Sequence, residues 1–223
     1  MDVRRRDESN EASPHARGRR HGWLLFAALA MAACGGPASP KTPSASKLTG
    51  VLRYYPLEKG MQWSFMLRDE MNGGPGLLAV TTVVEMDGNV ALLTTGKELT
   101  ELRIEKDGIV RVATGAYLLK WPMSAGDRWP GSAGALVEVL KTDEKVHVDA
   151  GEFEECIVVS ETFRGDDPRM ITTTYCPDVG PVMLEVHQLA VAPGDVPASA
   201  VARLRSYGPA TDFGAKAPAA GTP

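Results

Sequence analysis

The chain has 223 residues, with 24 lysines and arginines against 28 aspartates and glutamates and a formal net charge of −4. This acidic balance excludes a general affinity for nucleic acid and electrostatic docking on an anionic lipid surface. The length is sufficient for one domain with a sizeable core.

An apolar run, Trp23 to Ala33, is the first element of the chain, and three arginines lie just before it. The run is too short to span a bilayer core, which needs about 20 residues. It therefore predicts a cleaved export signal rather than a transmembrane helix. The residues that precede Cys34, Met31-Ala32-Ala33, resemble the bacterial lipobox, with Met31 in place of the usual leucine.

The lipobox resemblance implies that residues 1–33 are removed and that Cys34 carries acyl chains such as palmitate, which anchor the protein in a membrane. Gly35 follows, and the absence of an aspartate there favours the outer membrane. A plain signal peptide cut nearby, with Cys34 as a free thiol, remains the alternative. Loss of residues 1–33, with six basic and four acidic side chains, would leave a net charge of −6.

Cys156 and Cys176 are the other two cysteines. Outside the inner membrane the surroundings are oxidising, so a disulfide is expected. A hairpin centred on Asp166 places the two cysteines opposite each other, and such pairs approach within bridging distance. Two reduced cysteines that pack as small hydrophobic residues remain the alternative.

The mature chain divides into three parts by composition. Residues 34–47 form a Pro/Ser/Gly tether that is expected to be disordered. Residues 48–207 form one domain, and residues 208–223 form a Pro/Ala/Gly tail that is also expected to be disordered.

The apolar residues of the domain recur with a period of two, which is typical of strands. Asp87-Gly88 and Asp107-Gly108 are hairpin signals, and residues 136–140 and 145–148 are predicted to form a further hairpin. Roughly ten to twelve strands and no helix are predicted, which favours an antiparallel all-β domain: a curved sheet, a barrel or a sandwich. The strands are expected at residues 61–68, 77–85, 90–95, 100–105, 109–114, 136–140, 145–148, 151–159, 171–176, 182–187 and 201–207.

A short motif, P-x-x-x-G-x-x-W, occurs twice, from Pro56 to Trp63 and from Pro122 to Trp129. Two explanations are open: the chain consists of two related halves, or two unrelated segments converged on a common turn. Both tryptophans are expected to lie in the core.

Three motifs resemble, in their order and spacing, a family of uncharacterised bacterial lipoproteins and periplasmic proteins. They are Y-P-L-x-x-G-x-x-W from Tyr55, G-x-F-x-x-C from Gly151, and Y-x-P-x-V-G-x-V from Tyr175. The resemblance covers residues 48–207 and implies a β-rich fold of unknown function in the cell envelope. It supplies no catalytic residues.

Motifs of known chemistry are not found: H-E-x-x-H, C-x-x-C and G-x-S-x-G do not occur. His147 and His187 are expected to be surface residues on strands. A weak Ca²⁺ site at Glu161 and Asp166-Asp167 is less favoured than a charged turn. The protein is therefore predicted not to be an enzyme, and no catalytic residue, metal site or cofactor is expected.

These observations favour a non-catalytic envelope lipoprotein, held to the membrane through lipid on Cys34, whose β domain binds a protein or another envelope component. The alternative is a carrier of lipid or another apolar ligand in an open β-barrel. Such carriers cover their sheet with helices, and the lack of predicted helices counts against this alternative. A hydrolase is the third and least favoured possibility.

Overall fold

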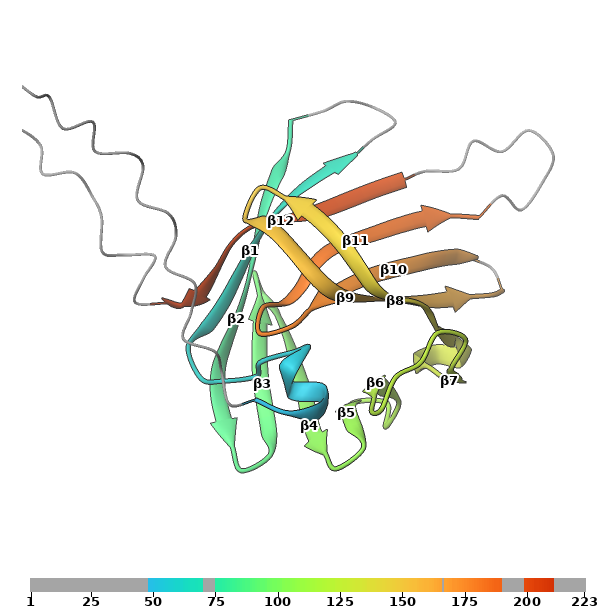
Figure 1. Ribbon diagram of the computed structural model, residues 1–223, viewed down its shortest axis with the longest axis horizontal. Coiled ribbons are helices and arrows are strands. Elements are labelled where there is room, and N and C mark those ends of the chain that lie inside the picture. The colour runs from blue at the N-terminus through green and yellow to red at the C-terminus, as the bar shows by residue number, and fades with distance from the viewer. Residues whose placement is uncertain (1–47, 70–74, 166, 190–198, 211–223) are drawn as a thin grey trace, which may run out of the picture. The chain divides into compact units, whose positions relative to one another are not determined.

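The structure is a computed structural model that describes residues 48–69, 75–165, 167–189 and 199–210 (Figure 1). Cys34, the export signal and the tether lie outside the described residues, as do Asp166 and the predicted tail beyond residue 210.

Within the described residues, twelve strands form one antiparallel sheet, which confirms the predicted all-β fold. No helix in the described part of the chain is long and apolar enough to span a membrane. The part of the chain that the structure describes has two 3₁₀ turns, η1 (Gly50–Arg53) and η2 (Ser132–Gly134). The strands are β1 (Met61–Asp69), β2 (Leu77–Asp87), β3 (Val90–Thr95), β4 (Glu98–Glu105), β5 (Gly108–Arg111), β6 (Tyr117–Lys120), β7 (Arg128–Pro130), β8 (Leu136–Val148), β9 (Gly151–Phe163), β10 (Arg169–Cys176), β11 (Gly180–Gln188) and β12 (Ser199–Pro209).

The sheet is nearly closed into a barrel. Its order is β6-β5-β4-β3-β2-β1-β12-β11-β10-β9-β8-β7, so strands that follow each other in sequence are neighbours except at β6 and β7. The first and last strands pair, from Met61 opposite Pro209 to Asp69 opposite Ala200. At the remaining break, the indole N–H of Trp129 on β7 donates to the carbonyl of Tyr117 on β6 over 3.1 Å.

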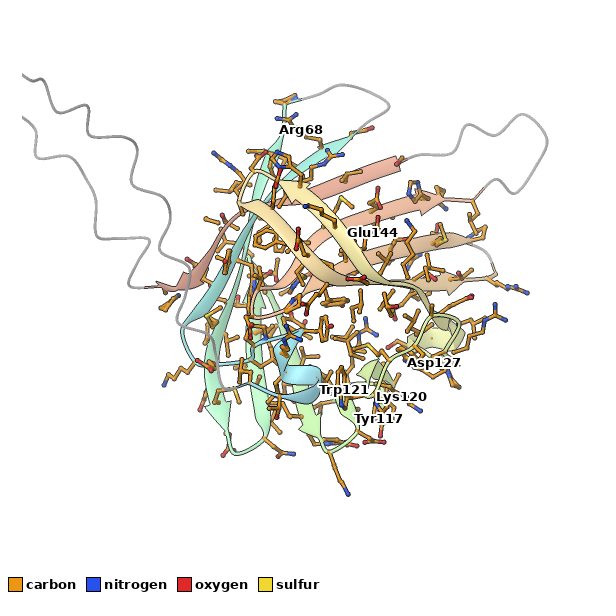
Figure 2. The ribbon with its side chains drawn as sticks, viewed as in Figure 1. Arg68, Tyr117, Lys120, Trp121, Asp127 and Glu144 are labelled. Carbon is orange, nitrogen blue, oxygen red and sulfur yellow. A yellow bond between two sulfur atoms is a disulfide. The ribbon has the colours of Figure 1, made fainter. Side chains whose placement is uncertain are left out.

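The β6 edge is covered by its own side chains. Figure 2 shows Tyr117, Lys120 and Trp121 near one another at this edge. The ammonium of Lys120 lies 4.6 Å from the centre of the Tyr117 ring. The Tyr117 hydroxyl donates to Asp107, and this hydrogen bond raises the pKa of Tyr117 to about 12. The hydroxyl therefore remains a hydrogen-bond donor at neutral pH.

One end of the sheet is closed by the segment that precedes β1. Val51, Tyr55 and Leu57 of this segment are buried, and the Tyr55 ring lies edge-on to Trp63 at a centroid distance of 5.4 Å. Trp63 is fully buried and donates its indole N–H to the carbonyl of Val179 over 2.6 Å. The turn after β10 is thereby fixed against β1 and against this closing segment.

The hairpin predicted within residues 136–148 is wrong. These residues form one long strand, β8, whose true partner is β9. Register shifts interrupt the pairing at three places between Val139 and Val146, and Asp143 has a positive φ of 63°. The polar residues in the middle of β8 indicated a turn, but they form bulges that bend the strand without ending it.

The bent hairpin of β8 and β9 reaches back to β12, as Figure 1 shows. At its tip, the N–H of Ala150 donates to the carbonyl of Leu204 over 3.0 Å. The rings of Phe153 and Tyr207 meet edge to face at 5.9 Å. The hairpin thus contacts a strand that lies four positions from β8 in the sheet order.

The predicted register of β9 and β10 is confirmed, because Val158 lies opposite Thr174 and Ser160 lies opposite Thr172. The predicted disulfide is confirmed as well: Cys156 and Cys176 are bonded, and their Cα atoms are 4.2 Å apart. Both cysteines are almost fully buried. A closed loop of this length stabilises a domain by about 3 kcal/mol in the chain-entropy account.

The repeated motif adopts the same local structure in both places. Gly60 and Gly126 have φ values of 87° and 90°, which favour glycine, and each N–H donates to a valine carbonyl, of Val83 and Val139, over 2.8 Å. The first copy of the motif precedes strands β1 to β6, and the second copy precedes strands β7 to β12, so each copy lies at the start of a set of six strands. The shared geometry favours two related halves over chance convergence.

Candidate ligand-binding cavity

A cavity of about 410 Å³ lies on the concave face of the sheet, where Figure 2 shows side chains from both halves converging. Residues from every strand except β7 and β8 line it. Its volume lies within the range of about 300–1,000 Å³ that is typical of small-molecule sites. Apolar side chains dominate the wall, among them Phe65, Leu67, Leu93, Leu102, Ile171 and Leu184.

The alternation of side chains along each strand determines which residues reach the cavity. Phe65 and Leu67 are two positions apart on β1 and face the same way. On β2, Ala79 lies directly opposite Phe65, and Thr81, two residues later, also lines the cavity. On β1 and β2, every second side chain therefore faces the cavity, as the predicted period of two requires.

An ion pair is part of this wall, between Arg111 on β5 and Glu161 on β9. The two terminal nitrogens of Arg111 donate to the two carboxylate oxygens over 2.8 and 2.7 Å. The side chains are only 24% and 13% exposed. Burial on its own lowers the pKa of Arg111, but the hydrogen bond and charge of Glu161 outweigh it, and the pKa lies above its ordinary value.

The ion pair also joins the two halves of the chain close to the break in the sheet. Arg111 belongs to the first six strands and Glu161 to the second six. A second cross-link lies beside it, because the hydroxyls of Thr114 and Ser132 are 3.0 Å apart. These contacts hold together the side of the cavity where no backbone ladder joins β6 to β7.

Two tyrosines, Tyr55 and Tyr175, lie in the cavity wall with their rings 5.9 Å apart. Burial raises the pKa of both hydroxyls. Both therefore stay protonated at physiological pH and can act only as neutral hydrogen-bonding groups. They give the closed end of the cavity a small polar surface without charge.

Threonines supply the other polar groups of the wall. Thr81 and Thr95, on neighbouring strands, have their hydroxyls 2.8 Å apart and hydrogen-bonded to each other. Thr100 and Thr173 also line the cavity. Among the described lining residues, Arg111 and Glu161 are the only charged ones.

The two histidines lie away from this cavity lining. His147 is mostly exposed and is 3.4 Å from Glu152 on the neighbouring strand, and His187 is 3.3 Å from the Ser199 hydroxyl. No group of three or more metal-ligating side chains placed to hold an ion occurs within the described ranges. Cys34, the predicted lipidation site, lies outside those ranges.

The role of Arg111 was not predicted from the sequence, and Glu161 was considered only as a weak Ca²⁺ ligand. In the structure Glu161 holds Arg111 instead. The alternation along the strands indicated that both side chains point inward, because Arg111 lies on the same strand face as Ile109, and Glu161 on the same face as Val159. A charged residue on the apolar face of a strand indicates an oppositely charged partner inside the fold, but the sequence alone does not identify that partner.

No family model matches the chain, and no curated protein matches it by sequence. Two solved structures are similar to it. A protein from Bacteroides fragilis, described as exported and as having a YmcC-like fold, has a TM-score of 0.47 at 14% identity. A protein from Parabacteroides distasonis, described as a lipoprotein, has a TM-score of 0.44 at 11% identity.

Each alignment covers 70% of this chain and 98% of the other. The family resemblance indicated by the sequence motifs stays a prediction.

Proposed function

We propose that this chain is a lipid-anchored protein of the bacterial envelope whose barrel-like domain binds a small amphiphilic ligand. The observation that carries the proposal is the cavity of about 410 Å³ with its largely apolar wall and its few polar groups. Binding sites for small molecules have this composition, because apolar surface supplies affinity and a few polar groups fix orientation. We therefore favour the ligand-carrier alternative from the sequence over the binding of a protein or another envelope component.

The envelope location rests on the sequence. The arginines, the short apolar run and Met31-Ala32-Ala33 before Cys34 support export and lipidation, with the outer membrane favoured by Gly35. A disulfide that is buried within the domain is in keeping with an oxidising compartment.

The lack of covering helices no longer counts against a ligand carrier. The twelve strands curve far enough to line a concave, partly open cavity themselves, and the segment with Tyr55 closes one end. A helix layer is therefore not needed to form the cavity.

A non-catalytic role fits the groups in the wall. The carboxylate of Glu161 accepts two hydrogen bonds from Arg111, which leaves it poorly placed to act as a base. The tyrosine hydroxyls of the wall have raised pKa values and remain protonated. These groups suit recognition better than proton transfer.

The other function predicted from the sequence, contact with a protein or envelope component, has one observation in its favour. Leu78 and Leu99 are 59% and 67% exposed, and both lie on the outer face of the sheet, because the residues that follow them, Ala79 and Thr100, line the cavity. Large apolar side chains that are exposed on one face of a sheet often belong to a contact surface. This surface is a second candidate and does not compete with the cavity for residues.

The test uses the full chain, produced in a Gram-negative bacterium and extracted from its membranes in a bulky steroid-based zwitterionic detergent, so that the detergent itself does not resemble the expected ligand. We expect an intact mass for residues 34–223 plus acyl chains, and a solvent extract that contains a small amphiphile in near-equal amount to the protein. The Ala202→Phe variant, which narrows the cavity from β12, is the matched control and should retain less of this amphiphile.

An extract free of any amphiphile other than the added detergent, or one that is identical for both proteins, would contradict the cavity proposal. Copurification of another protein in that case would favour the leucine surface instead. A soluble, unlipidated mass would contradict the anchor.

A further inference from the structure

The ion pair in the cavity wall restricts which head groups a ligand can have. This step rests on the proposed function and concerns the same cavity. Arg111 and Glu161 neutralise each other within a largely apolar wall, at distances of 2.7 and 2.8 Å. The other described lining residues are uncharged, so no second charge compensates a charged ligand.

Each member of the pair keeps unused hydrogen-bonding capacity. A guanidinium has five N–H donors, and Arg111 uses two on Glu161 and points one towards Ser132 over 3.4 Å. A carboxylate has about four acceptor positions, and Glu161 accepts two hydrogen bonds from Arg111. The pair can therefore accept one hydrogen bond from a ligand and donate another to it at nearly the same place.

A charged head group would meet one favourable and one unfavourable charge at short range. A ligand carboxylate would approach the carboxylate of Glu161, and an ammonium would approach the guanidinium of Arg111. Each would also lose its hydration on entering the cavity, which costs far more for an ion than for a neutral amide or hydroxyl. An uncharged head group avoids both costs.

The remaining wall provides space for an apolar chain away from the ion pair. β11, β12 and β1 are adjacent in the sheet and contribute Leu184, Ala202, Phe65 and Leu67. Arg111 and Glu161 lie on β5 and β9, which are near the break in the sheet. The head and chain of an amphiphile thus have separate parts of the wall.

We propose that the cavity selects a single-chain amphiphile with an uncharged head group that both donates and accepts hydrogen bonds, such as a primary amide or a hydroxyl. The head group binds the Arg111–Glu161 pair, and the chain lies against β11, β12 and β1. The volume of about 410 Å³ is near the lower end for small-molecule sites, which suits one chain rather than two.

The test compares dodecanamide, dodecanoate and dodecylammonium, which share one chain and differ in head-group charge. Binding to the full chain is measured near neutral pH by displacement of the uncharged dye Nile red. We expect dodecanamide to bind at least about tenfold more tightly than either ion, which corresponds to about 1.4 kcal/mol.

The Glu161→Gln variant sharpens the test, because it leaves the charge of Arg111 uncompensated while preserving the size of the side chain. We expect dodecanoate binding to tighten at least about tenfold and to overtake dodecanamide. Glu138→Gln is the matched control: it makes the same charge change and frees Arg128, which lies 2.8 Å from Glu138, away from the cavity lining. Its order of preference should equal that of the wild type.

Wild-type protein that binds dodecanoate as tightly as dodecanamide would overturn this inference and leave the proposed function standing. An unchanged order in a folded Glu161→Gln variant would also overturn it. Failure of all three compounds to bind the wild type would contradict the proposed function itself. The wild-type comparison remains decisive if the variant does not fold.

Discussion

Replacement of Trp63 by alanine lowers the free energy of unfolding by about 3–5 kcal/mol, the range for a large aromatic removed from a core. Trp63 is fully buried on β1, and its indole donates to the carbonyl of Val179 over 2.6 Å. Its ring packs edge-on against Tyr55. Alanine would therefore leave a cavity, an unpaired carbonyl and a loosened closing segment at once.

Urea denaturation, followed by tyrosine fluorescence or circular dichroism, measures this loss. Trp121→Ala is the control, because Trp121 is 38% exposed and packs mainly on Tyr54. We expect it to cost about 1 kcal/mol or less. Equal losses for the two variants would show that Trp63 does not hold the closing segment against the sheet.

Replacement of Ala79 by tryptophan weakens ligand binding at least about tenfold, or about 1.4 kcal/mol. Ala79 lines the cavity on β2 directly opposite Phe65. An indole at this position would fill space that the apolar chain of a ligand needs. Stability should fall less than in a packed core, because the added ring enters an existing cavity rather than displacing neighbours.

Leu78→Trp is the matched control for this variant. Leu78 is the preceding residue on the same strand, so its side chain lies on the opposite face, and it is 59% exposed. Nile red and dodecanamide titrations should give wild-type affinity for Leu78→Trp and weak binding for Ala79→Trp. If both variants bind as the wild type does, the ligand does not occupy the cavity.

Much of the fold was predictable because antiparallel strands and their turns produce local sequence patterns. The period of two gave the core positions Trp63 and Leu102, both of which are buried. A turn near Asp166 was enough to derive the pairing of Cys156 with Cys176, since hairpin register depends only on the turn and the strand.

The sequence did not predict how strongly the sheet curves. Curvature depends on bulges, such as those of β8 between Val139 and Val146. The polar residues that form these bulges are also typical of a turn, so the sequence does not distinguish a bent strand from a hairpin. The short strands β6 and β7 were missed because neither has enough residues to show a period.

The cavity could not be predicted for a related reason. Alternation shows that Arg111 and Glu161 face inward, but they are 50 residues apart and meet only across the break in the sheet. Their pairing depends on sheet closure, which is set by the whole strand order rather than by any local pattern.

A crystal structure of the full chain with dodecanamide would show where the ligand binds. We expect the amide to lie within hydrogen-bond distance of Arg111 and Glu161 and the alkyl chain to lie against Phe65 and Leu184. Dodecanamide bound on the outer face, at Leu78 and Leu99, with the cavity free of ligand, would contradict this expectation.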